Sequence, residues 1–382
     1  MKKLNLKQID FKQINIRQLL RNKWVWFTAL SFLSMILALC FMTAFRHAGD
    51  DLRSQHAAEE WAGTGESEFA QVSVFLSDGN AIDQNTIRTF RDAVKTACLD
   101  IMPGETKNLY CDAWSTKGST TVKGPNGSSD ASVIAVGGNF FQIHPQDLIS
   151  GGYFSDDDLM HDRVMLDVEL AWKLFGGYDL TGMTVTIGEK TFQVAGVIAR
   201  ETDKDTATAY TDGAGLYMSY DTYQTLNESA CINCYEIVMP NPVENFAVQL
   251  VTEKFAPETK PVIVENSSRF TAGNIFEELR NMSQRTLRTN TIYYPYWENA
   301  ARLVENRCMV YMVLAILFWI CPVVFVIILV VKLYRKTKHK VHDTYLDLKD
   351  QYENRVLFDN LKGKLKGLKH GRSDTEASEE NL

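Results

Sequence analysis

The sequence predicts an α+β membrane protein in which two transmembrane helices flank one large extracytoplasmic domain. Two apolar stretches that contain no charged residue, 24–45 and 309–331, predict the helices. At 1.5 Å rise per residue each forms a helix of about 33–35 Å, which is long enough to cross a bilayer. The 263 residues between them, 46–308, have an ordinary water-soluble composition and are long enough to bury a core of their own.

Basic residues beside the apolar stretches predict the orientation. The tail 1–23 holds seven Lys and Arg against one Asp, and five more basic residues follow the second stretch at 332–340. Because Lys and Arg stay on the cytoplasmic side, the tails 1–23 and 332–382 are expected inside and 46–308 outside. The charge split agrees, since the tails together carry a net +9 and the domain −16. The alternative for 24–45 is a cleaved signal peptide, although 22 residues exceed the usual apolar segment of one.

The domain opens with a predicted β-α-β unit. Residues 46–67 are polar and rich in Ala and Glu, which predicts a helical stalk. Alternating apolar residues predict a strand over 69–76. Asp83 is a suitable N-cap for a helix to about Leu99, where apolar residues recur at helical spacing. Residues 109–114 predict the second strand.

The middle of the domain is richer in turns, and the glycines and Pro of 123–129 predict a break. The elements predicted after it are a strand over 133–136, a helix over 168–175 ended by Gly176-Gly177, and a hairpin of strands 183–187 and 191–198.

The last third repeats the opening pattern. Its predicted elements are a strand over 234–239, a helix over 243–255, a strand over 261–265, a helix over 274–288 and a helix over 296–307 that enters the second apolar stretch. Two β-α-β units can pair into one mixed α/β layer, which makes the middle, about 116–228, an inserted subdomain.

Consecutive motifs in this middle part carry a family resemblance. They are F-F-Q-I from 140, I-S-G-G-Y-F-S from 149, V-M-L-D-V-E-L-A-W-K-L-F-G from 164, D-L-T-G-M-T-V-T-I-G from 179 and F-Q-V-A-G-V-I from 192. In this order, between two apolar stretches, they resemble the periplasmic core domain of MacB-type ABC transporter permeases, which have FtsX-like and lipoprotein-release relatives. The matching positions are Gly152, Phe154, Asp158, Ala171, Leu174, Phe175, Gly176, Gly182, Gly188, Phe192, Gly196 and Val197.

The resemblance implies a two-lobed domain, in which the insert at 116–228 forms a β-rich lobe on an α/β lobe near the membrane. It implies a multi-pass protein of the bacterial cytoplasmic membrane. Its members couple ATP hydrolysis on a cytoplasmic ATPase to movement of this domain, and the permease itself hydrolyses nothing. The implied partners are an ABC ATPase subunit, a full-length permease, or both.

One departure from the family affects the functional prediction. A usual permease has three further spans after the domain, whereas one span and a 51-residue tail follow it here. The prediction is therefore a non-catalytic permease-like component that couples the domain to an ATPase or a partner permease. The alternative is an extracytoplasmic ligand-binding or scaffold protein that uses the same domain without transport. Assembly into a homo-oligomer is left open.

Four cysteines, Cys98, Cys111, Cys231 and Cys234, lie in the predicted outer domain, where disulfides are permitted. We expect Cys231 to pair with Cys234, and a Cys98–Cys111 bond is the second expectation. A zinc half-site at Cys231 and Cys234 is the alternative, but no His lies nearby to complete one. Asp158 is expected to cap a turn.

The sequence contains no pattern typical of an enzyme, a cofactor site or a metal site. No Gly-x-x-x-x-Gly-Lys-Ser/Thr occurs, which excludes a P-loop ATPase site. The acidic domain would be repelled by nucleic acid.

The tail carries Val341, Tyr345, Leu348 and Tyr352 at spacings of 4, 3 and 4, which predicts an amphipathic helix or short coiled coil. Basic residues at 362–372 then either contact anionic lipid head groups or form a solvated linker. The acidic end from 373 is expected to be disordered.

Overall fold

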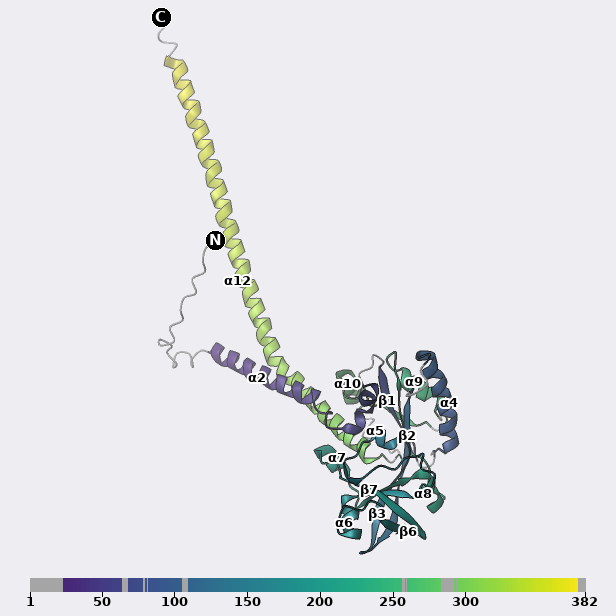
Figure 1. The fold of residues 1–382 in the computed structure, drawn as a ribbon. Coiled ribbons are helices and arrows are strands. Elements are labelled where there is room, and N and C mark those ends of the chain that lie inside the picture. The colour runs from purple at the N-terminus through teal and green to yellow at the C-terminus, as the bar shows by residue number, and fades with distance from the viewer. Residues whose placement is uncertain are drawn as a thin grey trace. The chain divides into compact units, whose positions relative to one another are not determined.

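The computed structural model describes residues 23–63, 68–77, 80, 82–104, 109–255, 258, 260–282, 292 and 294–376. The predictions for 1–22 and for 377–382 lie outside these residues. The chain divides into two compact units (Figure 1). One comprises the chain up to Cys40 together with Ala315 onward, and the other is Phe41–Leu314. The second unit contains the whole predicted domain 46–308 and a few residues of each apolar stretch.

Both predicted spans lie in helices that are long and apolar enough to cross a membrane. The first is α2 (Lys23–Arg46), and the second lies within α12 (Tyr296–Glu376). Within the first unit the two spans pack through small residues of α2, because Ser31, Ser34 and Ala38 are buried at i, i+3 and i+7 spacing. Small residues allow close approach of helices in lipid, where apolar burial gives no preference for helix over lipid.

Pro322 of α12 explains one of these contacts. Proline has no N–H to donate to the carbonyl four residues earlier, that of Phe318. The hydroxyl of Ser34 donates to this carbonyl at 2.6 Å. In lipid such a contact matters because water is not available to satisfy the carbonyl.

Within the described residues of Phe41–Leu314, ten strands form one mixed sheet (Figure 1). The order is β10-β1-β9-β2-β3-β8-β5-β7-β4, and β6 pairs with both β2 and β7. The strands are β1 (Phe69–Phe75), β2 (Cys111–Gly124), β3 (Gly127–Gly138), β4 (Leu148–Gly151), β5 (Arg163–Asp167), β6 (Thr184–Ile187), β7 (Lys190–Ile198), β8 (Gly215–Ser219), β9 (Cys234–Pro240) and β10 (Val262–Glu265). Two pairs are parallel, β3 with β8 and β5 with β7, and the others are antiparallel.

Helices cover both faces of this sheet. The larger apolar cluster lies on the face that receives α4 (Gln84–Ile101), α6 (Val168–Phe175), α8 (Tyr220–Leu226) and α9 (Phe246–Lys254). Figure 1 shows α4 and α9 together beside β1 and β2. Phe90 of α4 packs edge-on against Tyr235 and Phe255, with ring centroids 5.8 and 5.0 Å away.

The opposite face receives α3 (Ala57–Ala62), α5 (Phe140–Ile143) and the start of α12, around a second apolar cluster. The period of two along a strand sends neighbouring side chains to different faces. Val74 of β1 therefore lies in the first cluster and Phe75 in the second. The remaining helices are η2 (Arg53–Gln55), α7 (Lys204–Ala209) and α10 (Ala272–Arg280).

Elements with strong local signals are confirmed. Asp83 caps α4, accepting from the Thr86 N–H at 2.9 Å. The predicted helix 168–175 is α6, which ends at Gly176 in the left-handed conformation with φ 74°. The predicted hairpin at 183–198 is β6–β7, and Gly188 takes φ 61° in its turn. The two predicted β-α-β units do join, because β9 pairs with both β1 and β2.

The predictions 109–114 and 133–136 greatly underestimate one hairpin. Strands β2 and β3 pair from Ala113–Gly138 to Gly124–Gly127, so the polar residues on either side of the turn within the predicted break 123–129 are strand. The outer part of this hairpin is rich in Ser, Thr and Lys, so apolar residues alternate only weakly along it. Pairing with the other strand is what makes each segment a strand. The strands β4, β5 and β8 were not predicted. The sheet runs without interruption into this middle part, and the division into two lobes stays a prediction.

Three further predictions are corrected. The described part of the predicted stalk, residues 46–63, packs on the domain, because η2 and α3 bury Ser54, Gln55, Ala57 and Ala58. Gln71 of β1 holds them by donating from Nε2 to the Ser54 carbonyl at 2.7 Å. Residues 64–67 lie outside the described residues. Helix α10 ends at Arg280 rather than 288, and 283–288 lie outside the described residues. The tail is helical to Glu376, past the expected start of disorder at 373.

Candidate functional site

The first three turns of α12 are embedded in the folded domain. Ala300, Ala301, Val304 and Cys308 have no exposed surface, and Trp297 is 3% exposed. The small side chains let the helix approach its neighbours closely. The helix that continues into the second apolar stretch is therefore fixed to the domain over its first thirteen residues, Tyr296 to Cys308.

Arg269 is the centre of a buried ionic cluster on this part of α12. Its guanidinium is bidentate to Glu298, at 2.6 Å from Nη1 to Oε2 and 2.9 Å from Nη2 to Oε1. Its Nε donates to Oε1 of Glu305 at 2.5 Å. The three side chains are 3%, 1% and 6% exposed. Arg302 donates from Nε to Glu298 at 2.7 Å, so two cations balance two carboxylates.

The pKa directions agree with this balance. Burial by itself would raise the pKa of Glu298, but Arg269 and Arg302 outweigh it and the pKa is lowered. Burial would likewise lower the pKa of Arg269, and the two carboxylates raise it on balance. Glu298, Arg269 and Arg302 are thus held charged in this largely buried site. Such a cluster adds little net stability compared with apolar residues, but removing one member leaves an uncompensated buried charge.

A second branch connects this cluster to the sheet. Arg269 also reaches Gln55 of η2 and Asn266, at 3.3 and 3.5 Å. Asn266 donates to the Ser73 hydroxyl of β1 at 2.7 Å. Ser73 donates in turn to Glu236 of β9, also at 2.7 Å.

This branch ends beside α12 again. Nε2 of His144 makes a close hydrogen bond with the other carboxylate oxygen of Glu236, and both side chains are almost completely buried. The His144 ring packs on Trp297, with ring centroids 4.4 Å apart. The network therefore links β1, β9 and the end of α5 to the start of α12. Because it connects the sheet to α12, we treat this network as a candidate joint between them. The described residues hold no group of three His, Cys, Asp or Glu that could bind a metal.

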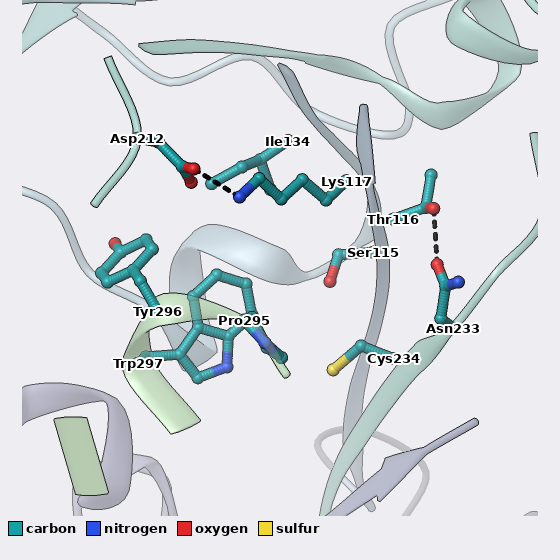
Figure 2. Close-up of a pocket in the computed structure, with 10 residues that line it drawn as sticks. All are labelled: Ser115, Thr116, Lys117, Ile134, Asp212, Asn233, Cys234, Pro295, Tyr296 and Trp297. Carbon is teal, nitrogen blue, oxygen red and sulfur yellow. Dashed lines mark hydrogen bonds and ion pairs between the residues drawn. The ribbon is translucent and has the colours of Figure 1, made fainter. Parts of the chain in front are cut away.

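A small pocket lies on the same face of the sheet (Figure 2). Residues of β2, β9 and the start of α12 line it, including Ser115, Cys234 and Trp297. Lys117 donates to Asp212 at 2.5 Å across its rim. Its volume of about 30 Å³ admits one or two waters and no organic ligand.

A family model for the MacB-like periplasmic core domain matches residues 28–260. The chain belongs to this family. Over 117 residues it is 32% identical to the macrolide export ATP-binding/permease protein MacB of Chromobacterium violaceum, a match that spans 28% of this chain and 18% of that relative. The matched region is thus less than a fifth of the length of this curated relative.

Solved structures of the same kind are similar at low identity. The periplasmic region of MacB from Actinobacillus actinomycetemcomitans has 17% identity and a TM-score of 0.39, over 55% of this chain and 92% of that one. The extracellular domain of the noncanonic ABC-type transporter YknZ from Gram-positive bacteria has 15% identity and a TM-score of 0.36, over 52% and 99%.

The positions that carry the MacB-like pattern lie around β7, α6 and the segment after β4, at the end of the sheet opposite β10. Phe154, Leu174, Phe192 and Val197 are buried, as is Ala171. Phe175 packs at the edge of the larger apolar cluster. These side chains shape the core.

The glycines of the pattern serve the backbone. Gly176, Gly182 and Gly188 have positive φ, where L side chains are disfavoured. At Gly196 a Cβ would lie 2.8 Å from the Ser150 carbonyl, because β4 passes close by. Nothing lies within 4 Å of a Cβ added at Gly152.

Asp158 does close a turn, as expected. It accepts from the Ser155 N–H at 3.3 Å and lies 3.7 Å from Arg163.

The structure forms neither predicted disulfide. Cys98 projects from α4 into the first apolar cluster, whereas Cys111 opens β2 on the opposite face of the sheet. Cys231 and Cys234 belong to an extended segment, in which three residues span about 10 Å. Disulfides need Cα atoms within about 7 Å.

We expect the buried thiols of Cys98 and Cys111 to be unreactive in the folded protein and available after unfolding. Burial raises the pKa of Cys98 to about 11, and burial together with Asp112 raises that of Cys111 to about 12, so little thiolate forms at neutral pH. Mass spectrometry after alkylation should show seven adducts on protein denatured without reductant. A reduced sample is the control. Fewer adducts without reductant than with it would show that disulfides are present and would support the original prediction.

The functional residues Arg269, Glu298, Glu305, Glu236 and His144 were not singled out from the sequence. The ectodomain histidines show no motif. One signal was present, because Glu298, Arg302 and Glu305 recur at i, i+4 and i+7 among small and apolar residues. Charged residues on an otherwise apolar helix face indicate a buried ionic partner.

Proposed function

We propose that this chain is a non-catalytic, permease-like membrane component of the MacB type. In this proposal it couples its extracytoplasmic domain to a cytoplasmic ABC ATPase, or to a full-length permease bound to one. The observation that carries the proposal is the buried cluster of Arg269, Glu298 and Glu305, which fixes α12 to the sheet. A movement of the sheet would then move the start of α12 with it.

The spans support coupling rather than conduction. Two helices cannot enclose a polar route through lipid, and neither 24–45 nor 309–331 holds an ionisable residue that would line one. The relative from Chromobacterium violaceum is named as both ATP-binding and permease protein. A separate ATPase subunit would supply ATP binding and hydrolysis, for which this chain shows no P-loop motif.

The proposed location is the bacterial cytoplasmic membrane, with both tails inside and the domain outside. The basic residues around 1–23 and 332–340 support this orientation. The exposed helical residues of the tail, such as Thr344, would then face the ATPase side. The same tail is the proposed contact for anionic lipid.

Site-specific photo-crosslinking in intact cells tests the proposal. A photo-reactive residue replaces Thr344 in the tail, and the control position is Ser128 at the exposed tip of the β2–β3 hairpin. We expect Thr344 to capture an ATPase subunit or a multi-span permease and Ser128 to capture neither. Capture only at Ser128, with an extracytoplasmic protein as the product, would contradict coupling and support the scaffold alternative. An ATPase captured at Ser128 would overturn the orientation.

A further inference from the structure

A polar cavity of about 200 Å³ lies beside the first residue of α12, separate from the ionic cluster. The ends of β5 and β7, helix α7 and strand β8 contribute to its wall. The lining residues that matter below are Asp167, Arg200, Glu201, Tyr210, Tyr217 and Tyr296. At about 30 Å³ per water, this volume corresponds to six or seven waters or a small organic molecule.

The only cation among the lining residues of this cavity is already neutralised. Arg200 donates from Nη2 to Asp167 at 2.6 Å and to the Gly213 carbonyl at 2.7 Å. The same nitrogen lies 2.7 Å from Glu169. The guanidinium also lies over the Tyr210 ring, 4.8 Å from its centroid. Arg200 is therefore committed to protein groups, and an anionic ligand would find no available positive charge.

Glu201 is the carboxylate left with weak partners. Its Oε1 accepts from the Tyr296 hydroxyl at 3.3 Å and from Gln146 at 3.4 Å, both at the long end for hydrogen bonds. In the described part of the chain no hydrogen bond is made to its Oε2. Burial raises the pKa of Glu201, and Asp203 adds to the rise. Neither hydrogen-bond partner of Glu201 is a cation, and His144 and Arg53 act on it only through electrostatic interaction at longer range.

Aromatic rings complete the wall. Tyr210 and Tyr296 lie edge-to-face with ring centroids 5.0 Å apart, and Tyr217 shares a 3.3 Å hydroxyl contact with Tyr296. Aromatic faces next to a carboxylate favour an organic cation, because the ring quadrupole and the carboxylate both attract positive charge. A neutral or anionic ligand gains from neither.

We propose that this cavity binds a small organic ammonium ion, with Glu201 as its counter-ion and Tyr210 and Tyr296 as its aromatic wall. Tyr296 opens α12, so an occupied cavity would contact the helix that enters the second apolar stretch. The proposal does not depend on an ATPase partner. A failure of ligand binding would leave the coupling function untouched, and a failure of coupling would leave ligand binding untouched.

Isothermal titration of the full-length protein in detergent with 1,4-diaminobutane tests the proposal. The neutral probe 1,4-butanediol is the matched control for shape. We expect saturable binding of the diamine, at least tenfold tighter than that of the diol. Affinity should increase with pH below neutrality, because burial raises the pKa of Glu201 and the carboxylate form attracts the amines, which stay protonated. No saturable binding of the diamine, or equal binding of the diol, would overturn the proposal.

The variant Glu201→Gln should reduce diamine affinity at least tenfold. Glu253→Gln, on the exposed face of α9, makes the same charge change away from the cavity and should bind like the unmodified protein. Glu201→Gln is expected to fold, because it removes a carboxylate that burial disfavours in its charged form. Tyr210→Phe keeps the ring and should retain binding, whereas Tyr210→Ala should weaken it. Equal affinity in Glu201→Gln and Glu253→Gln would show a non-specific charge effect.

Discussion

Replacing Arg269 by Met is expected to lower the free energy of unfolding by about 3–5 kcal/mol, the cost of leaving buried charges without their partner. The variant removes the ion pairs that Arg269 makes with Glu298 and Glu305 in a buried site, while Arg302 still pairs with Glu298. Methionine fills much of the arginine stem volume, so the cost comes mainly from charge. Denaturant unfolding followed by tryptophan fluorescence measures it, with Trp297 beside the cluster as a reporter.

Two controls identify the origin of this loss. Arg88→Met makes the same substitution at a solvent-exposed position of α4. It should change the free energy of unfolding by less than about 0.5 kcal/mol. The triple variant Arg269→Met, Glu298→Gln, Glu305→Gln removes the uncompensated charges. It should be more stable than Arg269→Met alone. A triple variant less stable than the single one would mean that packing, rather than charge, dominates.

The pH dependence of the free energy of unfolding gives a second test of the charge argument. The pKa of Glu298 is lowered in the folded protein, so its pairing contributes stability above the unfolded value of about 4.3 and loses it as pH falls through the folded value. In Arg269→Met the carboxyls can be protonated at acid pH, and the missing cation then matters less. The difference between the two proteins should therefore shrink between pH 7 and pH 4. A difference that is the same at both pH values would contradict the charge argument.

Asn306→Pro is expected to cost about 3 kcal/mol or more by breaking α12 near the end of its anchored turns. Asn306 is exposed, so its side chain contributes little packing. Proline removes the amide that donates to residue 302, and its ring clashes with that carbonyl. The break would separate Glu298 and Arg302 from the helix that follows. Amide hydrogen exchange should accelerate over 303–314 while β1 and β9 stay protected.

Asn306→Ala is the matched control, because alanine keeps the helix and removes the same side chain. It should unfold within about 0.5 kcal/mol of the unmodified protein. If coupling runs through α12, Asn306→Pro should still be captured with its partner by crosslinking at Thr344. In that complex, ATP hydrolysis should no longer respond to changes in the extracytoplasmic domain. Asn306→Pro that behaves like Asn306→Ala would show that continuity of α12 in this region is not needed.

Local rules account for what the sequence predicted correctly. The two apolar stretches follow from length and the absence of charge. Helix α4 follows from helical spacing with Asp83 as its cap, and the end of α6 follows from Gly176. The β6–β7 hairpin follows from alternation around Gly188. The family itself was recognisable from motifs within 140–198. These short segments contain the glycines and apolar residues that the local fold requires.

The hairpin β2–β3 shows where local rules end. Its outer half, around Thr120 and Ala131, is polar and carries little alternation, so only the pairing of the two strands makes it β structure. The cysteines show the same limit. Cys98 and Cys111 are close in sequence, but α4 and the start of β2 place them on opposite faces of the sheet.

By itself the sequence determined two candidate membrane spans, an α+β domain between them and the MacB-like family, since each depends on residues close together in the chain. The tertiary structure alone decided where the joint and the cavity lie. Arg269 is 29 residues from Glu298, and His144 is 92 residues from Glu236. From sequence alone a charged residue is predicted to be exposed, because burying a charge without a partner costs free energy. Whether a partner is present depends on long-range folding, and so the buried charges became visible only in the folded domain.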